Sequence, residues 1–83
     1  MKLNIMVTAS GSAIAQGIIK SLKMSSLDFD LITTDTQPYA AGLYRGKAGY
    51  IVPMAKHPDF IDKIIKICNR ENIDCILIGT DYE

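Results

Sequence analysis

Several features that mark common functional classes are missing from this sequence. Nine basic and nine acidic side chains cancel to a formal net charge of zero, so no charge excess points to a nucleic acid or an anionic membrane. No apolar run approaches the ~20 residues of a membrane-spanning helix, and the N-terminus shows no signal-peptide cleavage pattern. We therefore expect a cytoplasmic protein that binds neither nucleic acid nor membrane.

Residues that commonly bind metals or catalyse reactions are also scarce. Cys68 and Cys75 have six residues between them, which is neither a redox CxxC pair nor a zinc-ligand spacing. Both fall on apolar faces, so we expect both to be buried as small hydrophobic side chains. The single histidine, His57, is expected at the surface or at a helix cap. With no Ser-His-Asp, Cys-His or paired-carboxylate set, we predict no metal site and no catalytic residue in these 83 residues.

Apolar patterning is where the sequence is informative. A hydrophobic content of 48% excludes disorder, and 83 residues suffice for one small domain. Short apolar runs predict strands and apolar residues at helical spacing predict helices. Strands are predicted at 3–8, 29–34, 49–52 and 74–79, and helices at 13–24 and 58–71. The alternation indicates an α/β fold, a Rossmann-like three-layer half-domain with about four parallel strands and two main helices.

Each predicted helix has an apolar face and a recognisable start. Ser12 is the expected N-cap of the first helix, and Pro58 is expected at the first position of the second. The predicted face of the first helix consists of Ile14, Ile18 and Leu22 with Ala15 and Ile19 beside them. The predicted face of the second helix consists of Phe60, Ile61, Ile64, Ile65 and Cys68.

The turn after the first strand, Thr8-Ala9-Ser10-Gly11-Ser12, leads into the first helix as in nucleotide-binding units. It departs from the dinucleotide fingerprint G-x-G-x-x-G, because alanine stands at position 9 and only Gly11 and Gly17 remain. A P-loop is absent as well. Either the turn faces an anion, or Gly11 only permits the turn and Gly17 only lets the helix approach the sheet.

Asp35, at the end of the second strand, also has two interpretations. A carboxylate about 20 residues beyond the glycine turn is where nucleotide-binding units hold a ribose. An aspartate in this position also opens a turn through its own side chain. In the loop at 36–48 that follows, Arg45 and Lys47 either hold a phosphate or carboxylate, or are solvated while a helical turn packs Leu43 and Tyr44 on the sheet.

Ligands of parallel sheets bind outside the carboxyl ends of the strands. The residues that follow the predicted strands are therefore the candidate ligand-binding set. Near the C-terminus, Asp81 and Glu83 either serve a Mg²⁺ ion or form a frayed acidic end. The candidate substrate- or ligand-binding residues are Gly11, Ser12, Asp35, Thr36, Thr80 and Asp81.

The order of residues resembles the N-terminal pre-ATP-grasp domain of ATP-grasp ligases, within the carbamoyl-phosphate-synthase-like group. The resemblance covers essentially the whole chain. Its most specific pieces are Gly11-Ser12, Gln16-Gly17, Thr34-Asp35 followed by Ala41-Gly42-Leu43-Tyr44, and Ile78-Gly79-Thr80-Asp81. Members usually have glycine where this chain has Ala9 and Ala15, and often proline where it has Ala13.

The resemblance implies that residues 1–83 form a single domain of a longer ATP-grasp protein. Such a domain packs against a downstream ATP-grasp module and contributes to the acceptor-substrate side of the active site, with Gln16 a further residue of that side or of the domain interface. It is not catalytic alone, and no cofactor is expected in this chain. ATP and Mg²⁺ would bind the downstream module, which activates a carboxylate as an acyl phosphate for attack by an amine. The implied partners are that module and a small carboxylate or amine substrate.

Two other functions fit the same residues. One is an NAD(P)-binding Rossmann domain of a reductase-like protein, suggested by the opening MVTASGS. The other is a non-enzymatic interaction module or homo-oligomer that associates through an exposed sheet edge.

Overall fold

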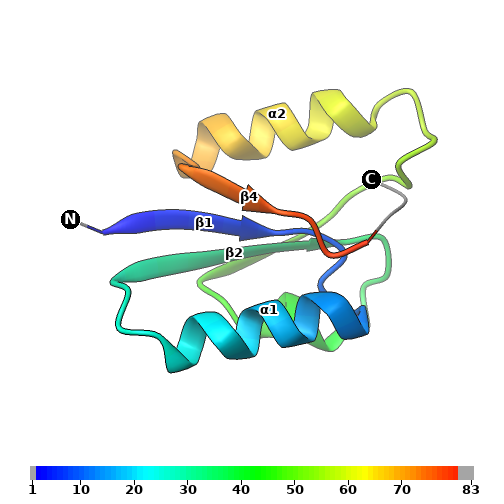
Figure 1. The fold of residues 1–83 in the computed structure, drawn as a ribbon. Helices are drawn as coiled ribbons and strands as arrows, with labels where there is room; N and C mark the ends of the chain where they lie inside the picture. Colours follow the sequence, from blue (N-terminus) through cyan, green and yellow to red (C-terminus); the bar gives the residue numbers. More distant parts are fainter. Residues whose placement is uncertain (1, 81–83) are drawn as a thin grey trace.

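The computed structural model describes residues 2–80, which form a parallel sheet with a helix on each face (Figure 1). The elements in chain order are β1 (Leu3–Val7), α1 (Ala13–Met24), β2 (Phe29–Asp35), the 3-10 helix η1 (Ala41–Tyr44), β3 (Ala48–Ile51), α2 (Phe60–Glu71) and β4 (Cys75–Leu77). The strand order is β3-β2-β1-β4, and every neighbouring pair is parallel. The predicted α/β Rossmann-like half-domain is confirmed.

Two apolar layers hold the helices to the sheet, one on each face. On the α2 face, Met6 and Ile32 of the central strands pack with Phe60 and Ile67 of the helix. On the α1 face, the buried side chains are Val7, Ala15, Ile19 and Leu31. Because β1 and β2 are covered on both faces, their runs are almost continuously apolar, as is usual in parallel sheets.

Helix α1 begins where the sequence predicts. The Ser12 hydroxyl accepts a hydrogen bond from the Ala15 N–H at 3.0 Å and so caps the first turn. The buried face is rotated from the predicted one, however. Ala15 and Ile19 are fully buried, whereas Ile14 is 55% exposed. The difference arises because β4 is a short edge strand, so the side of α1 above it has little sheet to contact.

Helix α2 begins later than predicted, and its apolar face also differs. Asp59 is the N-cap and Pro58 precedes it, so the prediction of Pro58 at the first helical position is wrong. The His57 Nδ1 atom accepts a hydrogen bond from the Asp59 N–H at 3.0 Å, consistent with the predicted capping role. Ile67 is buried instead of Ile61 and Ile65, which are 61% and 51% exposed.

The two cysteines lie in different surroundings. Cys68 packs against the α2-side core, and burial raises the pKa of its thiol. Cys75 is exposed, so the prediction that both are buried is wrong. An apolar run at the edge of a sheet is not covered on all sides, which sequence patterning alone does not reveal. Within residues 2–80, no helix has the length and apolar character required to cross a membrane.

The segment between β2 and β3 folds over the carboxyl end of the sheet. It forms η1 as the predicted helical turn, with Leu43 buried at 7% exposure. Tyr44 is 75% exposed, so the alternative in which a helical turn packs both Leu43 and Tyr44 on the sheet is correct for Leu43 only. Its hydroxyl donates to the Pro38 carbonyl at 2.6 Å instead, which closes the loop on itself.

Candidate functional site

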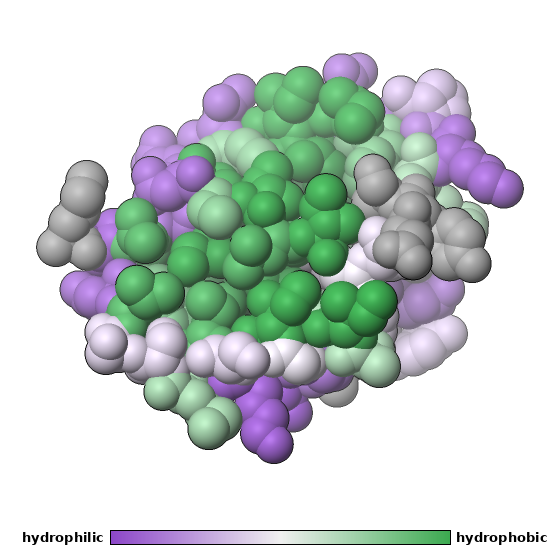
Figure 2. All heavy atoms as spheres, in the orientation of Figure 1, coloured by the Kyte–Doolittle hydropathy of each residue, from purple (hydrophilic) through white to green (hydrophobic). Residues whose placement is uncertain are grey.

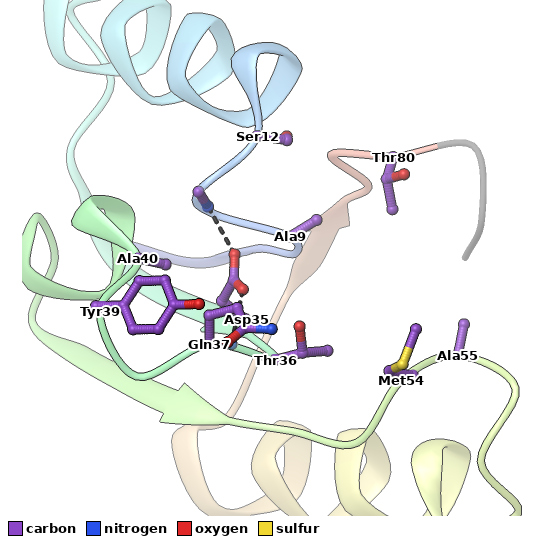
Figure 3. A pocket seen from close by; sticks show the side chains of 11 residues that line it. Ala9, Ser12, Asp35, Thr36, Gln37, Tyr39, Ala40, Met54, Ala55 and Thr80 are labelled. Atoms are coloured by element: carbon purple, nitrogen blue, oxygen red, sulfur yellow. Dashed lines mark hydrogen bonds between the residues drawn. The ribbon is translucent and has the colours of Figure 1, made fainter.

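A cavity of about 550 Å³ opens at the carboxyl ends of the strands (Figure 3). Its walls come from the β1–α1 turn, the segment after β2, the segment after β3 and the segment after β4. The lining residues are Ala9, Gly11, Ser12, Asp35, Thr36, Gln37, Tyr39, Ala40, Met54, Ala55 and Thr80. The structure thus brings Gly11, Ser12, Asp35, Thr36 and Thr80 together, while Asp81 and Glu83 lie outside the described residues.

Asp35 fastens the turn that precedes α1. One carboxylate oxygen, Oδ2, accepts a hydrogen bond from the Gly11 N–H at 2.7 Å, and Oδ1 accepts one from the Gln37 N–H at 3.0 Å (Figure 3). The bond to Gln37 is the local turn that the sequence allows for Asp35. The bond to Gly11 joins two strand ends, and only the tertiary structure creates it.

The polar atoms of the β1–α1 turn are largely engaged within the protein. Besides capping α1, the Ser12 hydroxyl donates to the Gly79 carbonyl at 2.7 Å. The Ser12 N–H donates to the Ala9 carbonyl at 2.9 Å. The Gln16 amide donates to the Ser10 carbonyl, which ties the helix back to the turn. Ser12 therefore connects β1, α1 and the end of β4.

Ala9 has a left-handed backbone conformation, with φ at 49°. Non-glycine residues avoid this region because Cβ approaches the following carbonyl oxygen. The dinucleotide fingerprint places its first glycine here, which permits the tight turn, and its second glycine, which lets the backbone approach a pyrophosphate, corresponds to Gly11. In this chain Ala9 adopts the left-handed conformation although it carries a methyl group, and it lines the cavity.

The cavity is lined mainly by apolar and neutral groups. Met54, Ala55 and Ala40 contribute apolar walls, and among the described lining residues only Asp35 has an acidic or basic side chain. Its carboxylate already lies against the Gly11 amide, where a phosphate oxygen would otherwise bind. These groups suit a neutral or positively charged ligand group better than a phosphate.

The two cations of the loop, Arg45 and Lys47, do not line this cavity. The Lys47 ammonium lies 3.7 Å from the Asp30 carboxylate, near the other end of the sheet. The Arg45 carbonyl accepts a hydrogen bond from the Lys23 ammonium at 2.8 Å. Within residues 2–80, no group of three His, Cys, Asp or Glu side chains lies close enough to hold a metal ion.

Residues 5–83 match the family model described as PylC-like, N-terminal domain. The chain belongs to this family. The family is a pre-ATP-grasp domain of ATP-grasp ligases, which confirms the resemblance seen in the sequence. A comparison with curated proteins gives no match.

Several cavity residues of this pre-ATP-grasp domain were missed by reasoning from the sequence. Met54 and Ala55 follow Pro53, which ends the predicted third strand, so the carboxyl-end rule could have found them. Gln37, Tyr39 and Ala40 lie in the long loop, whose path over the sheet had no sequence signal. A sequence search for chemically reactive residues does not find apolar cavity residues of this kind.

Proposed function

We propose that this domain forms the acceptor-substrate side of the active site in an ATP-dependent ligase of the carbamoyl-phosphate-synthase-like group. The observation that carries the proposal is the cavity at the strand ends, whose anion-binding amide is already occupied by Asp35. A site of this kind binds an uncharged or cationic part of a substrate and leaves phosphates to another module.

The proposed reaction joins a carboxylate to an amine through an acyl phosphate. A downstream ATP-grasp module would bind ATP and Mg²⁺ and neutralise the phosphate charges during transfer. Residues of this domain would position the acceptor beside the acyl phosphate and would not react themselves. Because the reaction consumes ATP, the proposal includes a cytoplasmic location.

The contacts of Asp35 argue against an NAD(P)-binding domain. In that class the carboxylate after β2 accepts hydrogen bonds from the ribose hydroxyls. Here both oxygens accept backbone N–H groups, and one of these is the N–H of Gly11, which stands at the fingerprint position where the backbone approaches the pyrophosphate.

The test uses the natural full-length polypeptide that contains this domain. ADP formation is measured with ATP, Mg²⁺ and a panel of carboxylates and amines, and the best pair is then used with Ala55→Tyr, which fills the cavity. We expect the KM for the acceptor to rise at least about tenfold, the loss of roughly 1.4 kcal/mol of binding, with the KM for ATP unchanged. Lys56→Tyr is the matched control, because the neighbouring Lys56 does not line the cavity.

Two results would contradict the proposal. One is a polypeptide that forms no ADP with any pair of substrates. The other is an Ala55→Tyr variant whose KM changes for ATP and not for the acceptor, which would place nucleotide in this cavity.

A further inference from the structure

The two edges of the sheet differ in how they are protected. The β3 edge is flanked by Lys47 and Pro53, and charges and prolines of this kind prevent further strand pairing. The β4 edge is preceded by Asp74, whose carboxylate accepts a hydrogen bond from the Asn4 N–H at 2.8 Å within the sheet, and no proline lies between Cys75 and Thr80. Figure 2 shows the molecule from the β4 side, and a broad apolar surface covers this edge between α2 and α1.

Apolar side chains flank β4 on both faces of the sheet. On the α1 face, a groove of about 510 Å³ is lined by Ile14, Ile18, Leu22 and Leu77 among others. On the α2 face, Ile76 is 41% exposed and aligns with Met6 of the α2-side core. A strand with apolar groups on both faces is typical of the interior of a parallel sheet.

Helix α2 continues this apolar surface. Ile61 and Ile65 are one turn apart on the same side of the helix, and both are more than half exposed. Two large aliphatic side chains at helical spacing are the contact that a second helix packed alongside α2 would make.

The handedness of the connections selects the face for such a helix. The connection from β1 to β2 runs toward the β3 edge of the sheet, and its helix α1 lies on one face (Figure 1). The connection from β3 to β4 runs toward the opposite edge, and its helix α2 lies on the other face. A further strand beside β4 continues in the second direction. A right-handed crossover then places its helix on the α2 face, and doubly wound sheets place the fifth strand beside the fourth.

We propose that the β4 edge docks a helix followed by a strand, contributed by the polypeptide C-terminal to this domain in the ligase. The strand pairs in parallel with β4, and the helix covers Ile61 and Ile65 on the α2 face. The inference rests on the proposed function, because membership in a family of N-terminal domains is what supplies this following polypeptide.

The test is thiol labelling of the natural full-length polypeptide in which Cys68 and Cys75 are replaced by alanine. A single cysteine is introduced as Ile65→Cys, with Lys63→Cys as matched control at an exposed position on the opposite side of the same helix. We expect a maleimide to label the Ile65→Cys thiol at least about tenfold more slowly, because it reacts only through local opening.

Three outcomes overturn the inference. Equal labelling of the two thiols means that nothing covers Ile65. Protection that disappears on dilution to a monomer in sedimentation assigns the edge to a second copy of the chain. Protection of an Ile14→Cys thiol together with rapid labelling of Ile65→Cys places the docked helix on the α1 face instead.

An ADP assay of the cysteine-free polypeptide separates this inference from the proposed function. Rapid labelling of Ile65→Cys in an active ligase overturns the docking alone. Slow labelling in a polypeptide that consumes no ATP supports the docking and overturns the ligase function.

Discussion

At the scale of single residues, the turn before α1 contains a strained backbone position at Ala9. Alanine has a left-handed backbone conformation there, with φ at 49°. The left-handed conformation costs a non-glycine residue about 1–2 kcal/mol, and glycine in its place loses roughly 0.5–1 kcal/mol through greater freedom of the unfolded chain. The first effect is the larger of the two.

We therefore expect Ala9→Gly to raise the free energy of unfolding by about 0.5–1 kcal/mol. Urea denaturation followed by circular dichroism measures the change. Ala48→Gly is a suitable control, since Ala48 begins β3 and has no left-handed backbone, and it should lower the free energy of unfolding. A destabilised Ala9→Gly variant would show that the Ala9 methyl group makes contacts worth more than the strain.

At the scale of elements, α1 contains a glycine that the fold does not require. The sequence suggested that Gly17 lets the helix approach the sheet, but a Cβ atom at this position would meet no atom within 4 Å. Gly17 lies instead along the open groove beside Ile14 and Ile18. The alternative that it serves helix–sheet packing is wrong, because the buried side of α1 is formed by Ala15 and Ile19.

Gly17→Ala should stabilise the protein by about 1 kcal/mol, the difference in helix propensity between the two residues. Thermal denaturation would show a higher midpoint. No change or a lower midpoint would indicate that the groove beside α1 is filled in the natural protein, so that a methyl group there collides with its occupant.

A hydrogen bond between two elements gives a pH-dependent contribution. The Tyr50 hydroxyl of β3 donates to the Glu71 carboxylate at the end of α2, and the Arg70 guanidinium lies 6.0 Å from the Tyr50 ring centroid. The hydrogen bond to Glu71, followed by burial, raises the pKa of Tyr50 above 10.0. The folded state therefore holds this proton more tightly than the unfolded state.

Tyr50→Phe should lower the free energy of unfolding by about 1 kcal/mol at neutral pH. The stabilisation is complete below pH 10.0 and is lost as the pH rises through the higher folded pKa, so the wild type and the variant should converge there. Urea denaturation of the wild type and the variant across this pH range measures the free energy of unfolding of each. Tyr39→Phe is the control, because the Tyr39 side chain is 79% exposed and its replacement should change stability little. A loss of stability in Tyr50→Phe that does not depend on pH would argue against the hydrogen bond from Tyr50 to Glu71.

At the scale of the whole molecule, the cavity exists because segments distant in sequence meet at the carboxyl end of the sheet. Gly42 of η1 lies against the β1–α1 turn so closely that a Cβ atom there would collide with the Ser10 carbonyl group. Ser10 itself is fully buried. Backbone on both sides leaves no flexible group to move aside.

Gly42→Ala should therefore lower the free energy of unfolding by about 2 kcal/mol or more, through overpacking. Gly17→Ala is its matched control, because the same chemical change at an open position should act in the opposite direction. Urea denaturation measures the free energy of unfolding of both variants. Equal effects would mean that η1 does not pack on the turn as described.

The sequence by itself determined the secondary structure and the layer order with good fidelity. Helix α1 was placed at its observed limits, since Ser12 and the apolar spacing act locally. The parallel sheet followed from the alternation of strands and helices. Five of the candidate ligand residues meet at one cavity, because parallel strands bring their carboxyl ends together.

Tertiary structure alone decided which apolar residues are covered and what Asp35 contacts. Periodicity counts apolar side chains but does not say which strand is at the edge, so the exposure of Ile61, Ile65 and Cys75 could not be read from it. The bond from the Gly11 amide to Asp35 depends on where two strands end relative to each other. Local sequence fixes local geometry, whereas a contact across 24 positions is fixed only when the sheet forms.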